Sequence, residues 1–168
     1  TSAALAFMLE NLPIPVLLVG SQRSSDRGST DAAMNLICAA EFIAKSDFAG
    51  VAICMHENMA DETCLVLPAC KTRKLHTSRR DAFKAVNGKP IARVCYKTKK
   101  IEFISKEYTK RNPKSKPSIK DRFEEKIGLL RAHPNMSPEE FEFYKGHKGL
   151  IIEAYALGQL PIDAPNEA

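Results

Sequence analysis

The segment VLLVGSQRSSDRGSTDAAMNL, residues 16–36, carries the pattern that decides the fold. It opens with Val16 to Val19, a short and continuously apolar run that is typical of a strand buried on both faces. The run ends at Gly20, and the residues that follow it are almost all polar. The segment therefore predicts a buried strand, a loop at the carboxyl end of that strand, and the beginning of a helix.

The helix predicted after this loop covers about residues 30–45. Ser29 or Thr30 can accept hydrogen bonds from its first free amides, and Asp31 lies at the positive end of the helix dipole. Apolar residues recur at steps of three and four, which predicts one stripe that faces the core. That stripe consists of Ala33, Leu36, Ile37, Ala40 and Ile43.

Two further apolar runs follow the helix, at residues 50–55 and 63–67, and each predicts another buried strand. Strands that alternate with helices are typical of a layered α/β domain with parallel strands. Ligands of such sheets bind beyond the carboxyl ends of the strands. We therefore expect a site at the loops after Val19 and Met55.

The amino-terminal residues 1–12 predict a buried helix whose packing partner lies outside this chain. A Pro-Ile-Pro breaker at residues 13–15 ends it. The apolar stretch is too short to span a bilayer, and it has neither a basic leader nor a cleavage site. We therefore expect no membrane or secretion signal.

The second half of the chain changes character after about Lys71. A β-hairpin is expected at the edge of the sheet, with strands over residues 91–96 and 100–104. Residues 105–122 are rich in Lys, Pro and Ser, which is typical of a linker.

The residues beyond the linker predict the opening of a second α/β unit. Strands are expected over 126–130 and 149–153, with a helix over 137–144 between them. Ser137 is a strong start for that helix, because Glu140 stands at the spacing of a capping box.

Charge is unevenly distributed, because 19 of the 25 Lys and Arg residues lie between Lys71 and Lys126. Such a stretch could meet nucleic-acid phosphates or an acidic protein surface, or it could be a solvated loop with edge strands guarded by lysines. No ladder of aromatic residues accompanies the charge, so a dedicated RNA-binding module is not indicated. The loop at residues 20–28 has no GxGxxG or Walker A motif, which excludes a Rossmann nucleotide binder.

The cysteines are odd in number and scattered, without a CxxC pair, so neither a zinc site nor a disulfide framework is indicated. Free and mostly buried thiols are expected, which favours a reducing compartment and hence the cytoplasm. The residues are Cys38, Cys54, Cys64, Cys70 and Cys95.

Three stretches of this chain resemble, in order, the L-asparaginase family. The first is residues 16–36, whose spelling is closest to the ammonia-producing D subunits of archaeal glutamyl-tRNA(Gln) amidotransferases. The second, KTRKLHTSRRDAF at residues 71–83, keeps the family's spacing of a Lys, a His two residues later and an Asp-Ala-Phe end. The third, residues 123–160, looks like the opening of the family's small domain.

This resemblance implies an α/β fold, the parallel-sheet, Rossmann-like asparaginase fold. It assigns residues 1–104 to the C-terminal part of the large domain, 105–122 to a basic linker, and 123–168 to the start of the small C-terminal domain. The chain would then be an internal fragment. The family's nucleophilic threonine and its threonine–aspartate pair are not among these residues, so we do not expect the chain to be active alone.

The resemblance also implies hydrolysis of a side-chain amide through an acyl-threonine intermediate. A hydroxyl is a poor nucleophile at neutral pH, so a nearby base must take its proton. A lysine can do this when burial or neighbouring positive charge lowers its pKa. Lys74 matches the family's catalytic lysine, whereas without the family a lysine in such a polar stretch would be solvent-exposed and inert.

Four further residues are candidates for the site. Ser21 and Gln22 follow the first strand, where the family's backbone contacts substrate, although they could instead form a turn satisfied by its own side chains. His76 is expected to make an ordering hydrogen bond, and Asp81 to tether an arginine. No metal site is expected.

By this resemblance, the whole protein would hydrolyse glutamine and pass the ammonia to an E subunit that activates glutamyl-tRNA(Gln). ATP and Mg²⁺ would bind that partner, so no cofactor is expected on this chain. A homodimer is expected, because sites in the family are built with help from a neighbouring subunit. Two alternatives remain: a stand-alone type I L-asparaginase, which the sequence AYALG at residues 154–158 favours, and a non-catalytic basic adaptor that binds RNA.

Overall fold

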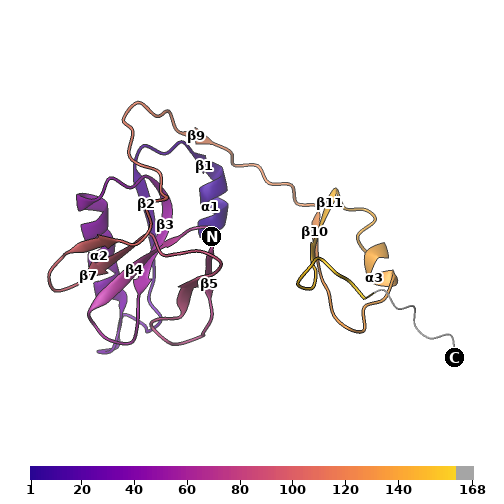
Figure 1. Cartoon of the computed structure of the whole chain (residues 1–168), viewed down its shortest axis with the longest axis horizontal. Helices are drawn as coiled ribbons and strands as arrows, with labels where there is room; N and C mark the ends of the chain where they lie inside the picture. Colours follow the sequence, from indigo (N-terminus) through magenta and orange to yellow (C-terminus); the bar gives the residue numbers. More distant parts are fainter. Residues whose placement is uncertain (162–168) are drawn as a thin grey trace. The chain divides into compact units, whose positions relative to one another are not determined.

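The computed structural model describes residues 1–161 and divides the chain into two compact units (Figure 1). The first unit covers Thr1–Asp121, and the second begins at Arg122. The division lies within residues 105–122, where the sequence predicts a linker. Residues 162–168, the end of the predicted second domain, lie outside the described part of the chain. None of the helices within the described residues is long and apolar enough to cross a membrane.

A five-stranded sheet forms the centre of the first unit, in the order β2-β3-β4-β7-β8. The strands predicted from the apolar runs and the edge hairpin are confirmed. The five strands are β2 (Pro15–Val19), β3 (Gly50–His56), β4 (Thr63–Pro68), β7 (Ala92–Cys95) and β8 (Ile101–Phe103).

The sheet is mixed rather than parallel throughout. Only β2 and β3 run parallel, joined by the helical crossover, while β3–β4, β4–β7 and β7–β8 are antiparallel. The reason lies in the connection between β3 and β4, residues 57–62, which is too short for the crossover that a parallel pair requires. The expectation that parallel strands make up the whole sheet is therefore wrong for its second half.

The β2 strand is less buried than its apolar sequence predicts. All five of its residues are partly exposed. Within the described part of the chain β2 is an edge strand, with a neighbour on one side only. The prediction that Val16 to Val19 is buried on both faces is therefore wrong for this unit.

The helix α2 (Ala32–Lys45) packs on the sheet through a different stripe from the one predicted. Its buried residues are Met34, Asn35, Cys38, Ala39 and Phe42. Leu36 is instead 62% exposed, and Ile37 and Ile43 are more than a third exposed. The helix is apolar on two sides, and the buried side is the one that contains a polar residue. The predicted stripe is therefore wrong.

The amino-terminal helix is shorter and more exposed than predicted. α1 (Ser2–Met8) has no fully buried residue. The chain then becomes β1 (Leu9–Glu10), which pairs antiparallel with β9 (Ser118–Ile119). The helix does not continue, because Leu9 and Glu10 pair with β9 and Asn11 has a φ of 54°, outside the range of a right-handed helix.

Residues 105–121 of the basic segment belong to the first unit, and their first part packs against the sheet. Tyr108 stacks on Phe103 with ring centroids 4.8 Å apart, and its hydroxyl donates to Asp47 Oδ1 over 2.8 Å. The amide of Ala49 donates to the Thr109 carbonyl over 2.8 Å. These contacts attach at least the first part of the segment to the sheet, in addition to the pairing through β9.

A second hairpin, which the sequence did not predict, follows β4. It consists of β5 (Thr72–Lys74) and β6 (Phe83–Ala85), paired antiparallel with Lys74 opposite Phe83. Its tip covers residues 75–82. This is the stretch that carries most of the family-like motif.

The second unit contains a parallel pair, β10 (Ile127–Arg131) and β11 (Gly149–Glu153), with the short helix α3 (Glu139–Glu142) between them. Both predicted strands are confirmed. One half of the predicted capping box is present, since the Ser137 amide donates to Glu140 Oε1 over 2.9 Å, whereas the helix has no side-chain cap hydrogen bond. The helix itself is shorter than predicted.

Candidate active site

Three loops of the first unit meet at the carboxyl ends of β2 and β3. They are the loop at residues 20–31, the β3–β4 loop at residues 57–62, and the hairpin tip at residues 75–82. Lys84, just after the tip, donates from Nζ to the Glu57 carbonyl over 3.1 Å. The structure therefore brings together the loops after Val19 and after β3, as the topology of β2 and β3 predicts, and adds the hairpin tip.

The first loop begins with a turn, Gly20–Arg23, whose backbone amides bind the side chain of Asp31. Asp31 is fully buried, and its Oδ1 accepts from the amides of Gln22 and Arg23, each over 3.0 Å. Its Oδ2 also lies 3.1 Å from the Gln22 amide. A carboxylate that accepts several backbone amides is a strong anchor. Ser21 at the top of the turn remains exposed, while Gln22 is half-buried.

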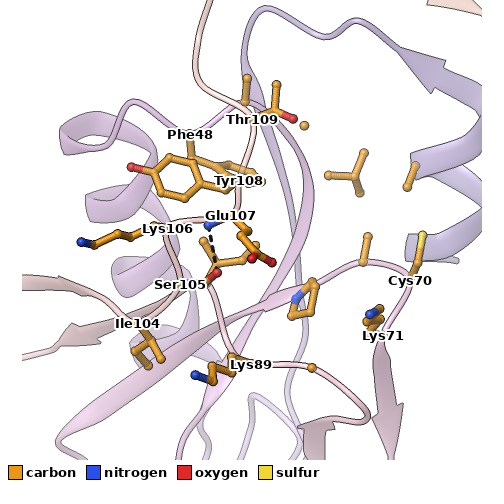
Figure 2. A pocket seen from close by; sticks show the side chains of 18 residues that line it. Phe48, Cys70, Lys71, Lys89, Ile104, Ser105, Lys106, Glu107, Tyr108 and Thr109 are labelled. Atoms are coloured by element: carbon orange, nitrogen blue, oxygen red, sulfur yellow. Dashed lines mark hydrogen bonds between the residues drawn. The ribbon is translucent and has the colours of Figure 1, made fainter.

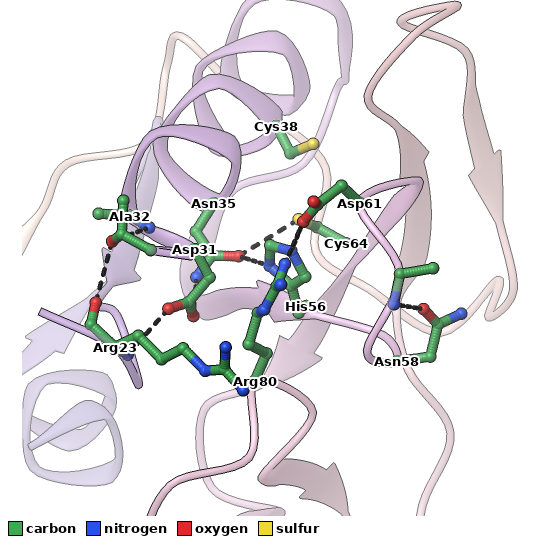
Figure 3. A network of polar contacts seen from close by, with 12 residues as sticks. Arg23, Asp31, Ala32, Asn35, Cys38, His56, Asn58, Asp61, Cys64 and Arg80 are labelled. Atoms are coloured by element: carbon green, nitrogen blue, oxygen red, sulfur yellow. Dashed lines mark hydrogen bonds and ion pairs between the residues drawn. The ribbon is translucent and has the colours of Figure 1, made fainter. Parts of the chain in front are cut away.

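Behind Asp31 lies a buried polar network (Figure 3). Asn35 donates from Nδ2 to the Gly20 carbonyl and to Asp31 Oδ2, each over 2.9 Å. Its Oδ1 lies 2.6 Å from His56 Nδ1 and also accepts from the Cys64 thiol over 3.4 Å. Both Asn35 and His56 have no exposed surface. Every polar group of the Asn35 side chain is thus satisfied, as burial requires.

The network reaches the surface through Asp61. Its Oδ1 lies 3.3 Å from His56 Nε2 and accepts a hydrogen bond from Arg80 Nη1. Burial raises the pKa of the Asp61 carboxyl, but the bond to His56 and the charge of Arg80 together outweigh this and lower it. Because Arg80 belongs to the hairpin tip, this contact ties the tip to the β3–β4 loop.

Lys74, the candidate catalytic residue, is the last residue of β5 and is exposed. Its Nζ lies 5.8 Å from the centroid of the Phe83 ring, at a distance at which a cation and an aromatic face attract each other. Within the described residues nothing encloses its ammonium group. Arg79 and Arg80, which lie close to Lys74 in sequence, are each paired with an acidic residue.

The hairpin tip is ordered by two of the predicted residues. His76 Nδ1 accepts from the amides of Ser78 and Arg79, each over 3.1 Å. Arg79 binds Asp81 through two bonds of 2.8 and 3.0 Å. The hydrogen bonds from Arg79 lower the pKa of Asp81 to about 2. The tip is therefore a structured element that can hold Lys74 at its base.

The predicted site residues thus fall on two elements, with Ser21 and Gln22 on the loop after β2 and Lys74, His76 and Asp81 on the β5–β6 hairpin. Sequence reasoning missed the residues that hold these loops in place. Asn35 and His56 could have been noticed as single polar residues within apolar elements, since such residues are buried only when they are hydrogen-bonded.

A large cavity lies at the opposite end of the sheet (Figure 2). Its volume is about 710 Å³, and it is lined by residues at the start of β3, the end of β4 and the segment after β8. Lys71, Lys89 and Lys106 are among the lining residues, but none of the predicted site residues is. The cavity is therefore separate from the site.

Residues that could bind a metal do not cluster in the part of the chain that the structure describes. Within residues 1–161 no group of three or more His, Cys, Asp and Glu side chains could hold a metal ion. All five cysteines are free, and Cys38, Cys54 and Cys64 are buried. A hydrogen bond with Cys64, together with burial, raises the pKa of the Cys38 thiol.

Comparison with known proteins gives consistent results. The family model described as "Asparaginase, N-terminal" matches residues 1–109. The D subunit of the glutamyl-tRNA(Gln) amidotransferase of Pyrococcus furiosus is 50% identical over 165 residues, which covers 97% of this chain and 37% of that protein. Its counterpart from Thermococcus kodakarensis is 49% identical, with the same coverage. The chain therefore spans little more than a third of the length of these relatives.

Solved structures show the same fold. The thermostable L-asparaginase from Thermococcus kodakarensis matches with a TM-score of 0.80 and 27% identity, over 95% of this chain and 45% of that one. L-asparaginase I from Vibrio cholerae matches with a TM-score of 0.78 and 23% identity, over 96% of this chain and 47% of that one. The α/β asparaginase fold implied by the sequence is thereby confirmed.

Proposed function

The chain belongs to the asparaginase family, and from this we propose that the whole protein is the ammonia-producing subunit of a glutamyl-tRNA(Gln) amidotransferase. The observation that carries the proposal is the 50% identity to such a D subunit over 97% of the chain. The chain covers only part of those relatives, so the activity concerns the product of the full open reading frame. That product hydrolyses glutamine to glutamate and ammonia through an acyl-threonine intermediate.

Within this proposal, each loop of the site has a task. Ser21 and Gln22 contact the substrate from the Gly20–Arg23 turn, whose amides Asp31 holds in a fixed arrangement. Lys74 takes part in proton transfer to and from the nucleophilic hydroxyl. His76 and Asp81 keep the hairpin tip in shape and so support Lys74.

Lys74 is exposed in this chain, whereas proton transfer by a lysine requires burial or nearby positive charge. The proposal therefore needs further parts of the whole protein, or a second copy of it, to cover the hairpin. A homodimer would supply such cover. We accordingly expect activity from the whole assembly.

The proposed partner is an E subunit that receives the ammonia and uses ATP and Mg²⁺ to activate glutamyl-tRNA(Gln). No cofactor is proposed for this chain. The proposed location is the cytoplasm, which suits the five free cysteines.

The main alternative is a stand-alone L-asparaginase. The residues that favour it are 154–158, AYALG, together with the structural likeness to the Thermococcus kodakarensis L-asparaginase. The two functions share the fold and Lys74. They differ in substrate and in dependence on a partner.

The remaining alternative, a basic RNA-binding adaptor, loses support from the ion pairs of the first unit. Several basic residues of segment 71–126 bind acidic residues from outside that segment. The excess of charge along the sequence is therefore partly neutralised in space. The pairs are Arg80–Asp61, Arg93–Glu57, Lys110–Asp47 and Lys120–Glu10.

The test is ammonia release from glutamine and from asparagine by the product of the full open reading frame. Each substrate is assayed with and without the candidate E subunit and glutamyl-tRNA(Gln). Glutamine turnover that rises with partner and tRNA is the expected result. Partner-independent turnover that favours asparagine would replace the proposal with a simple asparaginase. Absence of turnover from either amide, with salt-sensitive tRNA binding, would favour the adaptor.

A further inference from the structure

We propose that His56 is a positioning residue that couples the substrate turn, Gly20–Arg23, to the hairpin that carries Lys74. This inference rests on the proposed function, because it gives a purpose to two loops assigned there to substrate and proton transfer. It adds a residue that the family-like motifs do not contain. The evidence lies in the two neighbours of the imidazole ring.

The first neighbour is Asn35, whose side-chain orientation is determined by its own contacts. Nδ2 donates to two acceptors, the Gly20 carbonyl and Asp31 Oδ2, each over 2.9 Å. The remaining atom, Oδ1, must therefore be the one that faces His56, and an amide oxygen only accepts. It follows that His56 Nδ1 carries a proton and donates it over the 2.6 Å contact.

This bond stabilises the turn from behind. Asn35 holds the Gly20 carbonyl directly, and through Asp31 it affects the amides of Gln22 and Arg23. Without a donor at the position of Nδ1, Oδ1 of Asn35 would keep only the weak Cys64 thiol, at 3.4 Å. The Asn35 amide group could then rotate, and the turn would lose its fixed geometry.

The second neighbour is Asp61, at 3.3 Å from His56 Nε2. The same oxygen, Oδ1, accepts from Arg80 in the hairpin tip. His56 is completely buried, whereas the Asp61 side chain is 67% exposed, so the ring is the internal end of a link that leads to the surface. One imidazole thereby contacts the supports of both loops.

The alternative is a histidine that only fills the core. Such a residue would affect stability in general and would not affect the turn more than other parts of the unit. His56→Asn and His56→Leu separate the two roles, because the Asn amide nitrogen stands near the position of Nδ1 and can still donate to Asn35. Val94→Ala is the matched control, since Val94 is equally buried in β7 and its side chain takes no part in the network.

The experiment uses the product of the full open reading frame and two readouts. Hydrogen exchange, resolved to single residues by fragmentation mass spectrometry, reports on the amides of Gln22 and Arg23. Steady-state ammonia release from glutamine reports on KM and kcat. His56→Leu should speed exchange at both amides by about tenfold, which corresponds to the loss of about one hydrogen bond, and should raise KM. His56→Asn should keep exchange and KM within about threefold of the wild type.

Asp61→Asn tests the other side of the ring. It should speed exchange across the tip, residues 75–82, and lower kcat. Because His56 couples the two loops, Asp61→Asn should also speed exchange at Gln22 and Arg23, and unchanged exchange at these two amides would overturn the coupling. The proposal is overturned if His56→Leu leaves the turn amides as protected as in the wild type, or if Val94→Ala exposes them equally. Exchange does not depend on turnover, so a protein that released no ammonia would refute the proposed function and leave this test of His56 intact.

Discussion

Replacement of Asp31 by alanine should lower the free energy of unfolding of the first unit, because this one buried carboxylate anchors the Gly20–Arg23 turn. The change removes the acceptor of two backbone amides, those of Gln22 and Arg23, and one partner of Asn35. Each amide left without an acceptor costs about 1–3 kcal/mol. The turn is partly exposed, and water can replace part of the loss. We therefore expect Asp31→Ala to lower the free energy of unfolding by about 3 kcal/mol, near the lower end of the summed cost for the two amides and Asn35.

Urea unfolding of the 168-residue chain, followed by far-ultraviolet circular dichroism, measures this free energy. Asp26→Ala is the matched control, since Asp26 is an exposed acid of the same loop, and it should change the free energy of unfolding by less than about 0.5 kcal/mol. A value for Asp31→Ala as small as that of the control would refute the anchoring role of the carboxylate.

Two further predictions concern charge and packing. Asp81 has a pKa of about 2 in the folded chain, below the unfolded value of about 3.9. Its contribution to stability is therefore fully present above about pH 4 and is lost as the pH falls towards 2, and Asp81→Asn should remove that part of the acid dependence in circular-dichroism melts. On α2, Leu36→Lys should change the unfolding free energy by less than about 0.5 kcal/mol, whereas Phe42→Ala should cost about 3–5 kcal/mol. If Leu36→Lys lowered the unfolding free energy more than Phe42→Ala in urea unfolding, the buried side of α2 would be the stripe predicted from periodicity.

Local patterns in the sequence were sufficient for much of the fold. The apolar run of β3 is buried on both faces, and the Ser137 amide bonds to Glu140, which is one of the two bonds of the predicted capping box. These features depend on residues close to one another in the chain. The apolar run of β2 predicted its strand equally well but not its burial, because burial depends on how many neighbours a strand has.

The sequence predictions were wrong where contacts between residues far apart in the chain determine which side chains are buried. α2 is apolar on two sides, so periodicity alone could not choose between Leu36 and Phe42. The side that faces the sheet includes Asn35, which is favourable in the core only because Asp31, Gly20 and His56 satisfy it. A prediction from hydrophobicity alone places such a polar residue on the exposed side of the helix.

The candidate site divides in the same way. Lys74, His76 and Asp81 were found through a motif, and Ser21 and Gln22 through their place after a strand. The network behind them joins residues 31, 35, 56, 61 and 80, which have no common spacing. These residues come together only where the three loops meet in the fold, so the network could not be predicted from the sequence.

The most direct test of the central claim is glutamine hydrolysis by Lys74→Met in the product of the full open reading frame. Lys71→Met is the matched control, because Lys71 lies three residues earlier and lines the separate cavity at the other end of the sheet. With the fold checked by circular dichroism, Lys74→Met should lower kcat/KM by about 10²–10⁴-fold, as the loss of a proton-transfer group does. Lys71→Met should stay within about threefold. Turnover by Lys74→Met as high as that of Lys71→Met would contradict an amidohydrolase mechanism built on this lysine.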